Sequence, residues 1–169
     1  YYTAALLASV FGGGMSSRLF QEIREKRGLV YSIYAFNSPE KDTGTFGVYA
    51  GTGEKEVAEL LPVLCDEINN LADTLNDVEI TRAKNRAKAR ILMRSENWSN
   101  HAEGNAVDMI IHGRVVPDAE SIQKIDAVTK EDMSKLAHQI FSKKPTLAAL
   151  GPIGQVMAYD DVLKRLNHA

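Results

Sequence analysis

Two residues near the start of the chain have the types and spacing to bind and polarise a peptide bond. The segment 12–34 reads GGGMSSRLFQEIREKRGLVYSIY, and its pattern predicts a charged helix that ends at Gly28 and a strand that begins near Tyr31. Arg24 falls in the last turn of that helix, seven residues before Tyr31. A guanidinium and a phenol hydroxyl that converge there can hold a peptide carbonyl and donate to a developing oxyanion. A surface arginine beside an unrelated hairpin tyrosine is the commoner arrangement, so both interpretations stay open on the residues alone.

Three consecutive glycines, Gly12, Gly13 and Gly14, precede this helix and interrupt an apolar stretch at 1–11. A phosphate-binding loop would need a preceding strand and a G-K-[S/T] ending, and the sequence has neither. A tight turn between two helices, with at least one glycine at positive φ, is the favoured interpretation.

The remaining chemistry-bearing residues do not form a recognisable catalytic or metal motif. The histidines are His101, His112, His138 and His168. They form neither H-E-x-x-H nor H-x-x-E-H, and no pair stands at i, i+4, so we expect no metal site in this chain. No G-x-S-x-G motif is present, and the single cysteine, Cys65, lies in an apolar run and is expected to be a core residue.

A basic stripe runs along one predicted helix, where Arg82, Arg86, Arg90 and Arg94 recur every four residues. A nucleic-acid surface is conceivable for such a stripe, but a solvated helix face is the more common explanation. The net charge of −2 gives no global attraction to nucleic acid or to an anionic membrane. No stretch approaches the ~20 apolar residues that cross a bilayer, so we expect neither a membrane nor a nucleic acid as partner.

Hydrophobic periodicity predicts a single α+β domain over 1–169, with an antiparallel or mixed sheet covered by helices. The predicted helices cover 1–11, 16–26, 54–73, 76–93, 100–113, 117–125 and 129–140, with a last one after 155. The predicted strands are a hairpin at 31–37 and 45–51, and a buried strand at 146–151. Asn76 and Glu79 have capping-box spacing. The chain starts without methionine and inside a helix, which favours a fragment of a longer protein.

Two sequence motifs in this chain are specific enough to indicate a protein family. They are Gly12-Gly13-Gly14-Met15-Ser16-Ser17-Arg18-Leu19-Phe20 and Ile23-Arg24-Glu25-Lys26-Arg27-Gly28-Leu29-Val30-Tyr31-Ser32, and weaker ones include Asp42-Thr43-Gly44, Tyr49-Ala50-Gly51-Thr52 and Ala149-Leu150-Gly151-Pro152. Together they resemble the C-terminal, non-zinc-binding domain of the pitrilysin-type inverzincins, and most of all the bacterial relatives of mitochondrial processing peptidase. The resemblance spans nearly the whole chain.

That resemblance implies a metallopeptidase half-domain of the LuxS and processing-peptidase-like fold. In this family two such domains close around an unfolded peptide, and the N-terminal one carries zinc. The C-terminal domain supplies an arginine and a tyrosine, whose spacing matches Arg24 as the substrate-holding residue and Tyr31 as the stabiliser of the tetrahedral intermediate. Gly12, Gly13 and Gly14 resemble, in shorter form, a glycine-rich loop proposed to touch substrate. The family domain also opens with a strand, absent here, which would leave an exposed sheet edge.

The resemblance therefore implies the substrate-binding half of a zinc endopeptidase that cleaves peptides or presequences and is inactive by itself. Its partners would be a zinc-bearing N-terminal domain, on the same chain or another, and a peptide. The expected compartment is the cytoplasm, or the mitochondrial matrix in a eukaryote. The alternative is a non-catalytic structural member of the same fold, like the core subunits of respiratory complex bc1.

Overall fold

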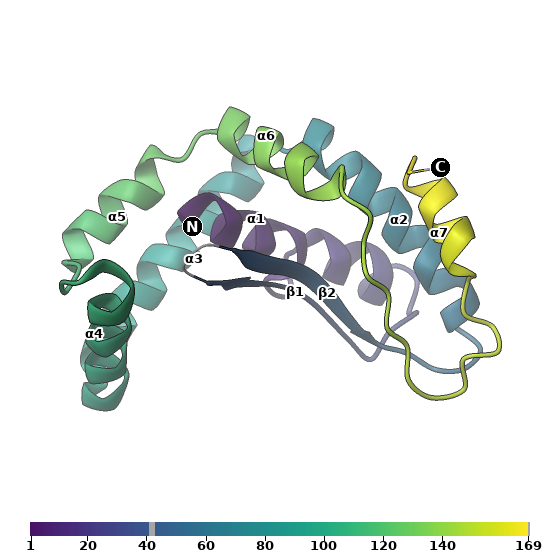
Figure 1. Ribbon diagram of the computed structural model, residues 1–169, viewed down its shortest axis with the longest axis horizontal. Coiled ribbons are helices and arrows are strands. Elements are labelled where there is room, and N and C mark those ends of the chain that lie inside the picture. Colours follow the sequence, from purple (N-terminus) through teal and green to yellow (C-terminus); the bar gives the residue numbers. More distant parts are fainter. Residues whose placement is uncertain (41–42, 169) are drawn as a thin grey trace.

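The computed structural model describes residues 1–40 and 43–168 and shows an α+β fold, as predicted (Figure 1). The elements in chain order are α1 (Tyr2–Gly12), η1 (Phe20–Glu25, a π-helix), β1 (Ser32–Pro39), β2 (Gly44–Gly51), α2 (Val57–Thr74), α3 (Asp77–Glu96), α4 (Trp98–His112), α5 (Asp118–Ala127), α6 (Lys130–Phe141) and α7 (Tyr159–Arg165). In the described part of the chain, no helix is long and apolar enough to cross a membrane.

The sheet in the described residues is the predicted antiparallel hairpin of β1 and β2. Its register pairs Ser32 with Gly51, Tyr34 with Tyr49, and Pro39 with Gly44. The connection is longer than a two-residue turn, as expected, although residues 41–42 within it lie outside the described part. Alternation along the strands sends one set of side chains toward the helices and the other set away from them.

The hydrophobic core lies between the hairpin and the helices. Phe11 of α1 is fully buried and meets the ring of Phe141 at the end of α6, which in turn meets Phe46 of β2. Ile33 from β1 joins the same cluster. Cys65 lies in a second, smaller cluster between α2 and α7, and burial raises the pKa of its thiol, as expected for a core cysteine.

The α2–α3 junction follows the predicted capping box. The Asn76 side chain accepts a hydrogen bond from the Glu79 backbone N–H, and the Glu79 carboxylate accepts one from the Asn76 backbone N–H. Both orphan donors at the start of α3 are therefore satisfied. The chain then runs through α3, α4 and α5 along one arm of an arch and returns through α6 over the hairpin (Figure 1).

The prediction of a buried strand at 146–151 is wrong. The segment has no strand structure, and the Leu150 side chain is fully exposed. A strand needs a neighbour to bond its backbone groups, and no described segment pairs with this one. Only Leu147 is anchored, because it packs against the cluster around Cys65.

Gly12 allows the end of α1 to lie directly on β1. A Cβ atom on Gly12 would stand 2.2 Å from the backbone nitrogen of Ala35 and 2.8 Å from the Ala35 Cβ. Both obstructing atoms belong to the centre of the sheet and cannot swing away. Any larger residue would therefore separate the helix from the hairpin.

We expect Gly12→Ala to lower the free energy of unfolding by about 1–3 kcal/mol, the usual range for overpacking a core. Gly154→Ala is a matched control, because a Cβ there meets nothing within 4 Å. Urea denaturation of both variants measures the difference. An equal, negligible effect of the two substitutions would contradict this account of Gly12.

Candidate functional site

The glycine turn between α1 and η1 is built by contacts from two directions. Gly14 has φ of 151°, a backbone conformation that favours glycine, so the predicted positive φ falls at this one position of the turn. A Cβ on Gly14 would lie 2.4 Å from Nη1 of Arg86, so the guanidinium of α3 lies directly over this glycine. The buried Ser17 hydroxyl donates to the Gly14 carbonyl oxygen at 2.6 Å and closes the turn.

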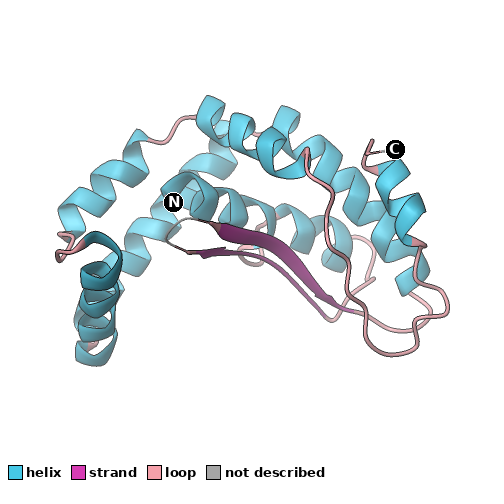
Figure 2. Cartoon of the chain, viewed as in Figure 1, coloured by secondary structure: helices cyan, strands magenta, loops and turns pink. Residues whose placement is uncertain are grey.

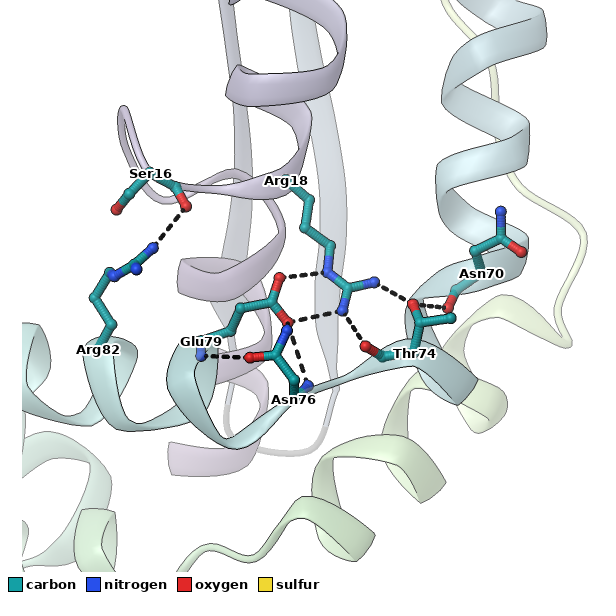
Figure 3. Close-up of polar contacts among 7 residues, drawn as sticks. All are labelled: Ser16, Arg18, Asn70, Thr74, Asn76, Glu79 and Arg82. Carbon is teal, nitrogen blue, oxygen red and sulfur yellow. Dashed lines mark hydrogen bonds and ion pairs between the residues drawn. The ribbon is translucent and has the colours of Figure 1, made fainter.

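Arg18 anchors the segment after the turn to the α2–α3 junction (Figure 3). Its Nε and Nη2 atoms donate to the two carboxylate oxygens of Glu79, both at 2.8 Å. Nη1 donates to the Thr74 hydroxyl and Nη2 to the Thr74 carbonyl oxygen, each at 2.6 Å. The Arg18 side chain is only 11% exposed, so this bidentate pair is partly shielded from water.

The sequence words did not reveal this role of Arg18. Its partners lie 56 and 61 residues further along the chain. The available signal was the capping box itself, because a Glu79 held at the start of α3 offers a fixed carboxylate to a nearby cation.

Arg24 lies on η1, whose wide turns come from bonds such as Lys26 N–H to Gln21 O. Ile23 faces the core, and the half-buried Arg24 places its guanidinium carbon 4.7 Å from the centre of the Phe20 ring. This cation–π contact limits the freedom of a long side chain. π-Helical turns are frequent at functional sites, which is compatible with a role for Arg24.

Tyr31 lies just before β1, on the far side of the Gly28 turn. Gly28 has φ of 65°, and its N–H donates to the Arg24 carbonyl oxygen at 3.0 Å. The Tyr31 backbone N–H donates to Gly51 O at 2.8 Å, whereas its side chain is 86% exposed. Backbone bonds thus fix both ends of the Arg24–Tyr31 segment. Among the described residues, no contact joins the Arg24 guanidinium to the Tyr31 hydroxyl.

Charges around η1 are partly compensated. A hydrogen bond from Lys26, supported by Arg27, lowers the pKa of Glu22. Burial raises the pKa of Glu67 on the neighbouring α2, and the Glu22 carboxylate adds to that rise. The basic end of η1 therefore lies beside two carboxyl groups with opposite pKa shifts.

The basic residues of α3 lie at the surface but also make contacts within the fold. Arg86 covers Gly14, and Arg82 donates to the Ser16 carbonyl oxygen at 3.3 Å. Lys88 and Arg94 form ion pairs with Asp126 at 2.9 Å and with Asp118 at 3.2 Å. The expected solvated face is confirmed for Arg82, Arg86 and Arg90, which are exposed, although several cations of α3 also tie it to the glycine turn and to α5.

Residues 1–40 and 43–168 contain no group of three or more His, Cys, Asp or Glu side chains placed to hold a metal ion. His138 pairs with Asp73 at 3.2 Å on an exposed surface. Arg24 and Tyr31 remain the predicted site residues.

The chain matches a known family over its N-terminal part. The family model described as "Peptidase M16 inactive domain" matches residues 1–87, just over half of the chain. The chain belongs to the M16 peptidase family, and the resemblance found in the sequence is confirmed.

Curated relatives carry zinc-protease and processing-peptidase names. An uncharacterized zinc protease of Rickettsia felis is 37% identical over 89% of this chain, and a probable mitochondrial-processing peptidase subunit beta of Arabidopsis thaliana is 33% identical over 91%. The chain spans 37% and 29% of these two proteins. It therefore represents about a third of the length of such relatives.

Solved structures share the fold. A chain of Complex III2 from Candida albicans matches 98% of this chain with a TM-score of 0.86 at 21% identity, and the match covers 42% of that chain. A conserved protein from Enterococcus faecalis V583 matches 82% of this chain and 32% of its own, with a TM-score of 0.71 at 25% identity.

We expect Arg18→Ala to lower the free energy of unfolding by about 1–3 kcal/mol, because it leaves the Glu79 carboxylate without its charged partner. Arg18→Lys keeps the charge but loses the two-bond geometry, so it should recover little of that loss. Arg114→Ala, which removes an exposed pair with Glu120, is the control and should leave the urea midpoint unchanged. Equal midpoints for Arg18→Ala and wild type would contradict the anchoring role.

Glu67→Gln should stabilise the protein at neutral pH. The folded-state pKa of Glu67 is raised, so the wild-type protein loses stability as the pH rises from the unfolded-state pKa through the folded-state pKa, and the full cost is present above the latter. The gain should shrink as the pH falls and vanish below the unfolded-state value of about 4.3. Urea unfolding across this pH range measures it, and a gain that grows toward acid would have the wrong sign.

Proposed function

We propose that this chain is the substrate-binding half of a zinc endopeptidase that acts on unfolded peptides or presequences. The observation that carries the proposal is the pairing of a ring-stacked Arg24 with an exposed Tyr31 at the two ends of one fixed turn. Membership of the M16 family and the zinc-protease names of the relatives support it.

In this proposal the zinc lies in another, N-terminal half, on the same polypeptide or on a second subunit. When bound there, zinc supplies an activated water and polarises the scissile carbonyl. This chain completes the site. Arg24 holds a peptide carbonyl through its guanidinium, and the Tyr31 hydroxyl donates to the oxyanion that develops. The Phe20 contact pre-orients Arg24, which reduces the entropy lost when substrate binds.

The glycine turn offers a backbone surface for the peptide. Gly12 is buried against β1, so contact within the run falls on the half-buried Gly13 and Gly14. On the side of the turn that Arg86 does not cover, glycine lets an extended chain approach the backbone closely. The proposed compartment is the cytoplasm, or the mitochondrial matrix in a eukaryote.

The test uses the intact two-part protein and a basic amphipathic peptide. We expect Tyr31→Phe to lower kcat at least ~100-fold, the scale for losing an oxyanion donor. Arg24→Ala should lower kcat/KM mainly through KM, because it removes a substrate contact. Tyr1→Phe and Arg27→Ala are matched controls outside the site and should leave both constants near wild type. The zinc-bearing half alone should be inactive until this chain is added.

Unchanged kcat in Tyr31→Phe, with activity still dependent on this chain, would favour the structural alternative. The domain would then act as a scaffold or lid, as proposed for a non-catalytic member of the same fold. Turnover by this chain alone would contradict the two-part site altogether.

A further inference from the structure

We propose that the face of the hairpin that points away from the helices binds uncharged, apolar side chains of the peptide substrate. We call it the aromatic face, and it consists of Tyr34, Phe36 and Tyr49. The inference rests on the proposed function and adds a specificity-determining surface to it. Four observations support it: the contacts among the three rings, the glycines beside them, their exposure and the lack of charge on both strands.

The three rings form one continuous platform. Tyr34 and Tyr49 are cross-strand partners, and their ring centroids lie 5.1 Å apart with the planes inclined by 26°. Phe36 lies two residues along β1, with its centroid 6.3 Å from that of Tyr34. These ring contacts, within and across the strands, hold each ring in place before any ligand binds.

Glycines on the same face of β2 give the rings room to lie flat. Gly47 is the register partner of Phe36, and a Cβ there would stand 2.4 Å from the Phe36 Cζ. Gly51 lies on the other side of Tyr49, whose hydroxyl is 3.7 Å from the position of a Gly51 Cβ. The aromatic rings therefore lie over backbone rather than between side chains.

The aromatic face is exposed although it is apolar. Tyr34, Phe36 and Tyr49 are 47%, 39% and 50% accessible. In Figure 1 the hairpin lies at the centre of an arch, with α4 at one end and the segment before α7 at the other. Figure 2 shows helices along the outer side of that arch. Exposed aromatic patches of this kind mark interaction surfaces.

The lack of charge on the aromatic face and its position next to Tyr31 favour an uncharged stretch of extended peptide as its ligand. Residues 31–39 and 43–52 include no charged side chain, so the surface offers nothing to the basic groups of a peptide or to a nucleic acid. The aromatic face also begins beside the proposed site, because the Tyr31 N–H donates to the carbonyl oxygen of Gly51, and a Cβ on that same glycine would lie 3.7 Å from the Tyr49 hydroxyl. From Ser32 to Phe36 it extends roughly 13 Å, about four residues of an extended peptide.

The experiment is a double-mutant cycle between protein and peptide. Zinc-depleted intact protein is titrated with a fluorescent basic amphipathic peptide, and the Kd is measured by anisotropy. A second peptide has its apolar residues replaced by serine while its basic residues are kept. The protein variant is Tyr34→Thr/Tyr49→Thr, which retains strand propensity. Trp98→Ser on α4 removes an exposed aromatic ring from another part of the surface as a control, and Tyr34→Phe/Tyr49→Phe keeps the rings without the hydroxyls.

We expect the threonine variant to weaken binding of the apolar peptide about tenfold and of the serine peptide hardly at all. The phenylalanine variant and Trp98→Ser should bind like wild type. Equal Kd values for the threonine variant and wild type would overturn the inference. So would a loss of association with the zinc-bearing half at unchanged peptide affinity, since the face would then be a domain interface. Either outcome leaves the separate Tyr31→Phe test of kcat unaffected.

Discussion

The two-pronged pair between Arg18 and Glu79 is the interaction on which the geometry of the candidate site depends. Glu79 is fixed because it caps α3, and Thr74 adds two further contacts from the end of α2. Arg18 thereby holds the start of the η1 segment against a rigid helix junction. Without that anchor, η1 would be oriented by weaker contacts, among them the glycine turn and the buried Leu19 and Ile23 side chains.

The anchor, the turn and the hairpin position the two candidate residues from opposite ends. η1 presents Arg24 on a π-helical surface, and the Gly28 turn returns the chain to the hairpin, where Gly51 binds the Tyr31 backbone. Arg86 covers the glycine turn from α3. The network leaves the Tyr31 side chain exposed and holds the half-buried Arg24 over the Phe20 ring. In the proposed function both side chains meet a peptide that the other half also binds.

Local signals predicted most of the fold. The capping box at Asn76 and the alternation at 31–51 depend on neighbouring residues, and the structure has both. The failed strand at 146–151 depends on a pairing partner, which local pattern does not contain. The anchor of Arg18 and the roles of the α3 stripe also required long-range contacts. Arg24 and Tyr31 were found through their spacing within a sequence motif of the family, and their joint action remains a proposal.

The most direct test of the central claim is a crystal structure of the intact two-part protein with zinc and a non-cleavable peptide analogue. The account predicts the Arg24 guanidinium and the Tyr31 hydroxyl within about 3.2 Å of oxygens of the analogue at the scissile position. A structure in which the halves enclose the analogue while both side chains stay beyond hydrogen-bond reach would contradict the shared active site.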